Sequence, residues 1–340
     1  MTLTVAGFGL GGLGQLELQL FADMDGVDVI AGADPALSAR KKFDTGFDAP
    51  AYRTAEELLD EHAVDIVNVA SIHSVHYEQV MAALDAGAHV HVEKPMTTTV
   101  ADAASLVDAA AASDQLVQVG YQRHFDPRYR ELRERLDRGV VGEPHFVDCH
   151  LEQDWVDYAK TWRGDAELSG GGFLYDSGSH LLDVLLWTLD AEPASVSATT
   201  DPRGTGVDIN SALSVELERN GNRVTASVAL IGDGPTTPDV GDSLDVYGRS
   251  GQLEYAQDGL VLAKRGADPT EISVEDETEF VVLTEAKLTN LVEAIRGNAD
   301  IAVPPEDGLR AIALSEAATL SAERGECVDV QELIADARHS

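Results

Sequence analysis

The chain has 340 residues, 44% of them hydrophobic, which is enough apolar material for two folded cores. Its 60 acidic and 24 basic side chains give a net charge of -36, which excludes a nucleic-acid-binding surface and argues against an anionic membrane partner. Two cysteines are too few for a disulfide framework, and no signal peptide or membrane span is recognisable, so we expect a cytoplasmic protein.

The acidic residues are scattered along the whole chain rather than gathered in one tail. Salt at about 1 M shortens the Debye length to about 3 Å, which would relieve the repulsion among so many carboxylates. The sequence therefore predicts a halophilic protein from a salty cytoplasm. The alternative is an ordinary acidic protein that needs no salt.

The first 120 residues alternate short apolar runs with helical patterns, which is typical of parallel strands joined by crossover helices. The predicted strands are residues 3–7, 27–33, 66–70, 89–92 and 116–120. The predicted helices are residues 15–22, 55–62, 77–86 and 100–112. The pattern predicts a doubly wound, α/β nucleotide-binding domain over residues 1–121.

A glycine-rich run, GFGLGG, follows the first predicted strand and places Gly7, Gly9 and Gly12 in a G-x-G-x-x-G spacing. The first glycine suits a tight turn, the second lets the backbone approach a pyrophosphate, and the third lets helix and strand pack closely. Asp34 ends the second strand, where it suits ribose hydroxyls and disfavours a 2′-phosphate. The basic residues 40–42 could reach such a phosphate, although an exposed helix turn is the simpler interpretation. We predict bound NAD or NADP, with NAD slightly favoured.

Lys94 stands where an apolar strand ends, in the run HVHVEKPM. It is one of only six lysines in this acid-rich chain, and Glu93 and Pro95 flank it. A scarce cation at the end of a strand in a nucleotide-binding sheet predicts a catalytic or cofactor-contacting residue.

From about residue 122 the pattern changes to strands with hairpin turns. The predicted elements are a charged helix at 127–138, strands at 146–151, 212–217, 224–230, 243–247, 252–255 and 260–263, and helices at 284–296 and 306–324. Asn220-Gly221 and Asp258-Gly259 are typical hairpin turns. We predict a second α/β domain over residues 122–340, with a largely antiparallel, open sheet.

The run GGGFLYDSGSH, ending at His180, leads into an apolar helix. Asp176 and His180 are four residues apart and would lie on one face if the helix has begun by Asp176. A carboxylate beside an imidazole suits proton transfer. An aspartate that caps the helix, with a structural histidine, is an equally good interpretation.

A metal site is a weaker interpretation of the histidines. His89, His91 and Glu93 alternate along one strand, and His73 and His76 precede a helix, so a set of ligands can be drawn. A buried strand that leads into a site explains the first three residues more simply, and no cysteine pairs support a metal. We predict no metal.

Five ordered motifs together resemble the glucose-fructose oxidoreductase, inositol dehydrogenase and rhizopine catabolism (Gfo/Idh/MocA) family. They are the glycine run, residues 70–95, VGYQRHFDP at 119–127, Trp162-Arg163, and GGGxxxDxGxH. The resemblance extends over nearly the whole chain. It implies a Rossmann domain followed by an α/β domain whose open sheet usually mediates subunit contacts, so we expect a homodimer or homotetramer.

The resemblance also assigns roles to particular residues. Those that line the meeting point of substrate carbinol and nicotinamide would be Lys94, Asp176 and His180. Those that contact the cofactor or its surroundings would be Ser71, His76, Glu93 and Gln122. Trp162 and Arg163 would shape the sugar pocket. Ile72-His73 departs from the Pro-Asn that is common in relatives, so the loop on the cofactor side differs from the family pattern.

The resemblance implies an NAD(P)-dependent dehydrogenase that oxidises a secondary hydroxyl of a small-molecule sugar, cyclitol or related polyol. His180 would accept the hydroxyl proton, Lys94 would hydrogen-bond the same oxygen, and Asp176 would orient His180 or bind a neighbouring hydroxyl. Lys94 and His180 could exchange roles, because burial can lower the pKa of a lysine. An NAD-dependent glycoside hydrolase and a non-catalytic dinucleotide-binding sensor are alternatives within the family.

Overall fold

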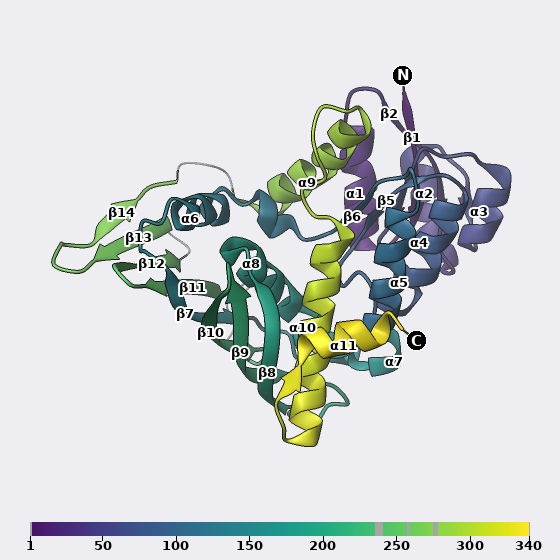
Figure 1. Ribbon diagram of the computed structural model, residues 1–340. Coiled ribbons are helices and arrows are strands. Elements are labelled where there is room, and N and C mark those ends of the chain that lie inside the picture. Colours follow the sequence, from purple (N-terminus) through teal and green to yellow (C-terminus); the bar gives the residue numbers. More distant parts are fainter. Residues whose placement is uncertain (1, 235–240, 257–258, 275–277, 340) are drawn as a thin grey trace. The chain divides into compact units, whose positions relative to one another are not determined.

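The computed structural model describes residues 2–234, 241–256, 259–274 and 278–339 (Figure 1). The chain divides into two compact units. The first unit comprises Met1–Thr98, Asp102–Gln122 and Glu279–Leu309, and the second comprises Thr99–Ala101, Arg123–Thr278 and Arg310–Ser340. The predicted boundary at residues 121 and 122 lies close to the change of unit after Gln122. Residues 279–309 belong to the first unit, so the second unit is not the continuous stretch 122–340 that the sequence predicts.

The first unit contains a six-stranded parallel sheet of order β3-β2-β1-β4-β5-β6, which confirms the doubly wound layout (Figure 1). Its strands are β1 (Leu3–Phe8), β2 (Val27–Ala33), β3 (Ala51–Tyr52), β4 (Ile66–Val69), β5 (His89–Val92) and β6 (Val117–Val119). Its helices are α1 (Gly12–Ala22), α2 (Leu37–Phe47), α3 (Ala55–Glu61), α4 (His76–Asp85), most of α5 (Val100–Ala111), and α9 (Phe280–Ile295).

The core of the first unit explains why α9 belongs to it. The connections from β1 to β2 and from β4 to β5 cross the sheet in opposite directions, so right-handed crossovers place α1 and α4 on opposite faces. Helix α9 packs against α1 and β5. Leu288, Leu291 and Val292 of α9 are buried in the same apolar cluster as Val5 and Leu18. A helix far along the chain thus completes the core around the first strand.

The second unit contains a nine-stranded sheet within the described residues, of order β14-β13-β12-β11-β7-β10-β9-β8-β15 (Figure 1). Its strands are β7 (Pro144–Glu152), β8 (Glu192–Asp201), β9 (Asn210–Arg219), β10 (Asn222–Ile231), β11 (Gly241–Gly248), β12 (Gly251–Ala256), β13 (Gly259–Lys264), β14 (Thr270–Ile272) and β15 (Val328–Asp329). Its helices are α6 (Pro127–Asp137), α7 (Ala166–Ser169), α8 (Ser179–Leu189), most of α10 (Pro305–Arg324), and α11 (Val330–Ala337).

The second sheet is largely antiparallel, as predicted, with β7 and β10 as its parallel pair among the described strands. Asn220 and Gly221 have φ values of 52° and 75°, as the predicted hairpin turn between β9 and β10 requires. Asp258 of the other predicted turn lies outside the described residues. None of the helices in the described part of the chain is long and apolar enough to cross a membrane.

Candidate active site

The glycine-rich loop between β1 and α1 makes a close contact that only glycine allows. Gly9 has a φ of 87°, a backbone conformation that side chains rarely adopt. A Cβ atom at this position would lie 2.5 Å from the carbonyl oxygen of Ala70, in the loop after β4. A Cβ atom on Gly7 would likewise lie 2.5 Å from a methyl carbon of Leu18. Gly9 therefore needs to be glycine, because it meets backbone atoms at a positive φ, whereas a side chain at Gly7 would require Leu18 to shift.

The third glycine of the motif has a different role from the predicted one. A Cβ atom on Gly12 would meet no atom of the described residues within 4 Å, whereas one on Gly14 would lie 2.1 Å from the carbonyl oxygen of Gly9. Close packing between helix and loop therefore occurs at Gly14. In the described structure no side chain caps α1, whose N-cap residue is Gly11. The start of α1 thus has no side-chain cap and leaves space at Gly11 and Gly12, which fits a dinucleotide pyrophosphate.

Asp34 joins the end of β2 to the glycine-rich loop. Its Oδ2 accepts a hydrogen bond from the backbone N–H of Leu10 at 2.9 Å, and its Oδ1 accepts one from Ala36 at 2.7 Å. An ionised carboxylate has about four acceptor sites, so it can still accept from ribose hydroxyls. The Arg40 guanidinium donates to the carbonyl oxygens of Asp34 and Pro35, at 2.7 and 2.9 Å, and the two lysines after it are exposed.

The His76 ring lies between two loops at the carboxyl edge of the first sheet and contacts a backbone carbonyl oxygen of each. Its Nδ1 lies 2.9 Å from the carbonyl oxygen of Pro95, and its Nε2 lies 3.2 Å from that of Ser71. The hydroxyl of Ser71 donates to Oε1 of Gln79 at 2.7 Å. Burial lowers the pKa of His76, and this effect exceeds the opposing effect of the two carbonyl groups. The neutral ring carries one N–H, so it donates a hydrogen bond to one of these two carbonyl oxygens.

Lys94 follows β5 at the same edge of the sheet, and its side chain is half-buried. The peptide bond between Lys94 and Pro95 is cis. The backbone N–H of Lys94 donates to Oε2 of Glu93 at 3.2 Å. Because β1, β4 and β5 are parallel neighbours, their carboxyl ends bring the glycine-rich loop, Ser71 and Lys94 to one edge.

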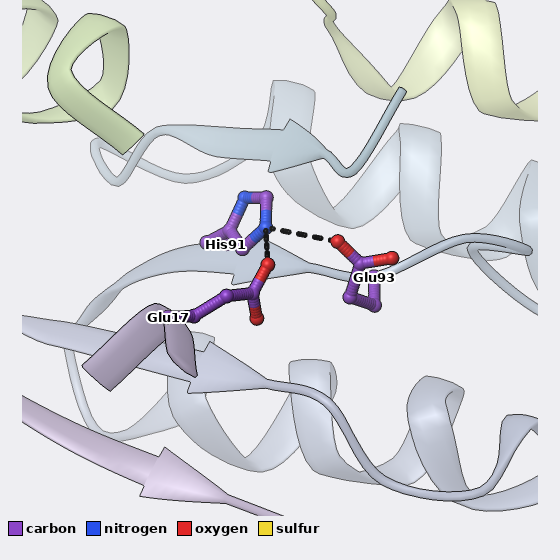
Figure 2. Close-up of side chains that lie close together, drawn as sticks. All are labelled: Glu17, His91 and Glu93. Atoms are coloured by element: carbon purple, nitrogen blue, oxygen red, sulfur yellow. Dashed lines mark ion pairs between the residues drawn. The ribbon is translucent and has the colours of Figure 1, made fainter. Parts of the chain in front are cut away.

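Glu93 belongs to a buried charge cluster together with Glu17, His91 and Lys287. Figure 2 shows one nitrogen of the His91 ring directed at both carboxylates, with Nε2 3.5 Å from Glu17 Oε1 and 3.7 Å from Glu93 Oε1. The Lys287 ammonium group donates to both of these oxygens, at 2.8 Å to Glu17 and by a short contact to Glu93. Burial acts to raise the pKa of Glu93, but Lys287 and His91 outweigh it and hold the pKa well below its usual range.

The same cluster is the strongest candidate for a metal centre among the described residues. The ligand atoms of Glu17, His91 and Glu93 lie within 4.8 Å of one another. However, the Lys287 ammonium already provides the positive charge that these carboxylates need. His89 is engaged elsewhere, because its Nδ1 accepts from the backbone N–H of Leu116 at 2.9 Å. The donor set therefore fits an ammonium group better than a metal ion.

In the second unit, Asp176 lies in a π-helical turn, Leu174–Gly178, directly before α8. It is 6% exposed, and its Oδ2 accepts from the indole N–H of Trp155 at 2.8 Å and from Nε of Arg163 at 3.1 Å. The chain is thus helical from Leu174 onwards, but Asp176 lies in the π-helical turn and His180 in the first turn of α8, so the two are not in one regular α-helix. The cap of α8 is Gly178, so the alternative of a capping aspartate is wrong.

Gly172, just before the π-helical turn, fits tightly against the half-buried Asp208. Asp208 accepts from the backbone N–H of Gly172 at 2.9 Å and from that of Leu174 at 2.8 Å. A Cβ atom on Gly172 would lie 2.0 Å from the carbonyl oxygen of Asp208. Burial raises the pKa of Asp208 despite these hydrogen bonds. This contact fixes the start of the turn that carries Asp176.

Arg163 connects two of the predicted substrate-side residues. Its guanidinium carbon lies 4.4 Å from the centre of the Trp162 ring and 5.6 Å from that of Tyr158. Arg163 also pairs with Asp176, so Trp162, Arg163 and Asp176 form one cluster. His180 and Gln122 are both half-buried. The pair between Arg163 and Asp176 is compatible with a substrate-binding role and with a structural ion pair.

Each unit also contains supporting residues that sequence analysis did not single out. Lys287 and Glu17 support Glu93 in the first unit, and Trp155 and Asp208 support Asp176 and its turn in the second. The scarcity of lysine, which directs attention to Lys94, applies equally to Lys287. The other three have no local signal, because their partners are distant in the sequence.

The Rossmann sheet, its glycine-rich loop and the mostly antiparallel second sheet define a two-domain, dinucleotide-binding oxidoreductase. Residues 3–121 match the model of the oxidoreductase family with an NAD-binding Rossmann fold, and residues 129–254 match the GFO/IDH/MocA C-terminal domain. The chain therefore belongs to the Gfo/Idh/MocA family of NAD(P)-dependent oxidoreductases, which act on CH–OH groups.

Similar proteins support this placement. The rhizopine catabolism protein MocA of Rhizobium meliloti is 27% identical over 92% of this chain and 92% of its own. Inositol 2-dehydrogenase 3 of Saccharopolyspora erythraea is 27% identical over 97% of this chain and 96% of its own. The structure of a levoglucosan dehydrogenase in complex with NADH has a TM-score of 0.87 at 17% identity, covering 97% of this chain and 99% of the other. The last comparison shows the shared fold.

Proposed function

We propose that this protein is an NAD(P)-dependent dehydrogenase that oxidises a secondary hydroxyl of a sugar, cyclitol or related polyol. The observation that carries the proposal is that Lys94 and the glycine-rich loop lie at the same carboxyl edge of the parallel sheet, with the Lys94 backbone held by Glu93. The names of the relatives, which include inositol and levoglucosan dehydrogenases, supply the class of substrate.

The cofactor is proposed to lie along the glycine-rich loop. The open N-terminus of α1 at Gly11 and Gly12 would receive the pyrophosphate, and Asp34 would accept hydrogen bonds from the ribose hydroxyls. A negative charge at Asp34 would repel a 2′-phosphate, so NAD is favoured over NADP. Bound nicotinamide supplies a hydride acceptor.

The chemistry of the chain itself is proposed to be proton transfer and charge stabilisation. The Lys94 ammonium would hydrogen-bond the reacting hydroxyl and stabilise negative charge on its oxygen, and His180 would accept the proton. Asp176 would orient His180 or accept from a neighbouring hydroxyl, while Arg163 and Trp162 would face the polyol with donors and an apolar ring surface. If Lys94 is the base instead of His180, its replacement by alanine is expected to lower turnover in the same way.

A screen of sugars, sugar acids and inositols in concentrated salt tests the proposal, with NAD⁺ and NADP⁺ supplied separately. We expect one class of polyol to be oxidised with the appearance of reduced cofactor. Lys94→Ala should lower turnover by about a hundredfold or more while cofactor binding is retained. The exposed Lys264 provides a matched control, since Lys264→Ala should be neutral.

Two outcomes of the screen would replace the proposed activity by another one. Release of free sugar without net reduced cofactor would indicate a glycoside hydrolase. Tight binding of the dinucleotide without any turnover would indicate a sensor.

A further inference from the structure

We propose that Lys287, on α9, is a positioning residue that holds the Glu93 carboxylate and, through it, the backbone of Lys94. The inference rests on the proposed function, because it assigns to Lys287 an effect on the residue that would contact the reacting hydroxyl. Lys287 itself touches neither substrate nor cofactor in this account.

The geometry of Lys287 is that of a buried connector. Its side chain is 2% exposed, and its ammonium group donates to Oε1 of Glu17 at 2.8 Å and by a short contact to Oε1 of Glu93. Glu17 is completely buried and Glu93 is 7% exposed. An ammonium group so placed is retained by two carboxylates rather than by water.

The two oxygens of Glu93 have different partners. Oε1 faces Lys287, while Oε2 accepts from the backbone N–H of Lys94 at 3.2 Å. A Cβ atom on Gly120 would lie 2.5 Å from Oε1, so the carboxylate also packs closely against β6's end. Because the carboxylate is planar, fixing Oε1 fixes the direction of Oε2, and with it the hydrogen bond to Lys94.

Lys287 also connects Lys94 to the helix that begins at the glycine-rich loop. Glu17 lies on α1, and its second oxygen accepts from the side-chain amide of Asn68 on β4 at 3.1 Å. One cation therefore links α1, β4 through Glu17, and the end of β5 through Glu93. The same contact would set the position of the proposed catalytic lysine relative to the cofactor loop.

The net charge of the cluster shows how the positioning role of Lys287 can be tested separately from its contribution to the stability of the fold. Two carboxylates and one ammonium leave the cluster with a net charge of one negative unit when His91 is neutral. Lys287→Met alone should unfold the protein readily, because it leaves two uncompensated carboxylates in the core. Combining it with Glu17→Gln restores the original net charge but leaves Glu93 without its cation.

The experiment compares the wild type, Glu17→Gln, Lys287→Met, and the double variant Lys287→Met/Glu17→Gln. It measures the urea midpoint, NAD affinity, kcat and KM for the polyol, and hydrogen exchange of the Lys94 backbone amide. In the double variant we expect NAD affinity within about threefold of wild type and kcat lower by about a hundredfold with a smaller change in KM. The Lys94 amide should exchange at least about tenfold faster.

Glu17→Gln is the matched control, because it retains the pair between Lys287 and Glu93 and its amide oxygen can still accept the hydrogen bond from Lys287. It should keep nearly wild-type kcat and exchange. Wild-type kcat and exchange in the double variant would overturn the proposal and leave Lys287 as charge compensation only. Unfolding of the double variant as readily as the single one would contradict the charge count. If the wild type oxidises no polyol, the proposed function fails, whereas the exchange measurement still decides whether Lys287 holds Lys94.

Discussion

His76 has a carbonyl oxygen against each ring nitrogen, an arrangement with consequences for stability at low pH. Burial lowers its pKa in the folded state. The unfolded chain therefore binds the proton more readily, and the contribution of His76 is complete above its usual pKa of about 6.5 and is lost as the pH falls below it.

His76→Gln should cost about 1–3 kcal/mol at neutral pH, because a backbone carbonyl loses its buried donor. It should also make the free energy of unfolding less dependent on pH below about 6.5, since the titrating group is gone. Urea titrations across this range check both effects. The exposed His145→Gln is the control, and an equally steep pH dependence in both variants would contradict this account.

Gly12 and Gly14 offer a contrast between binding and packing. Gly14→Ala should destabilise the protein by about 1–3 kcal/mol, because the new Cβ would overlap the carbonyl oxygen of Gly9. Gly12→Ala should leave stability unchanged or slightly higher, yet weaken NAD binding by about tenfold or more, since the methyl group would stand where the pyrophosphate approaches. Unfolding curves and NADH fluorescence titrations measure the two effects separately, and equal stability losses would refute the assignment.

At the scale of single residues, sequence predicts chemistry where a residue type is rare or a motif is local. Lys94 stands out by its position at a strand end. Lys287 is equally rare, but it lies within an amphipathic helix, and its role depends on partners 270 and 194 residues away. The spacing of Gly7, Gly9 and Gly12 predicts the loop, whereas the packing role of Gly14 requires the path of α1.

At the scale of elements, α9 shows what periodicity can and cannot predict. Its helical pattern is clear from the sequence, and the helix is present over Phe280–Ile295. The pattern does not predict which of the two units α9 belongs to, because its apolar face could pack against either sheet. In the structure, Leu288, Leu291 and Val292 pack into the core of the first unit.

The position of α9 leads to a prediction about fragments. A fragment of residues 1–122 should not fold stably, because it lacks part of the core and leaves Glu17 and Glu93 without Lys287. In the complete chain, Leu291→Ala should cost about 2–5 kcal/mol. Circular dichroism and urea unfolding check both, and a cooperatively folded fragment would contradict the assignment of α9 to this core.

Several of the elements that sequence analysis did not predict are short or weakly patterned, although the amphipathic helix α11 was missed as well. Helix α2 buries Phe43, β3 has two residues, and β8 ends in two exposed threonines and an aspartate. The π-helical turn that carries Asp176 was also unpredictable, because its hydrogen bonds depend on packing of Gly172 against Asp208. Long and strongly patterned elements were predicted with boundaries close to those observed.

At the scale of the whole molecule, the net charge of -36 predicts dependence on salt. Raising KCl from about 0.1 M to about 2 M should raise the urea midpoint, because screening reduces repulsion among the carboxylates of the folded state. Sucrose at matched water activity is the control, since it stabilises compact states without screening charge. An unchanged midpoint in KCl, or an equal gain in sucrose, would count against a halophilic protein.

The proposed activity as a whole depends on hydride transfer assisted by Lys94. The most direct test supplies the polyol substrate with deuterium at the carbinol carbon that is oxidised. The label is followed by mass spectrometry in the wild type and in Lys94→Ala. We expect deuterium at C4 of the reduced nicotinamide, and a transfer rate about a hundredfold lower in the variant with NAD binding retained. Deuterium found only in water, or an unchanged rate in Lys94→Ala, would contradict the account.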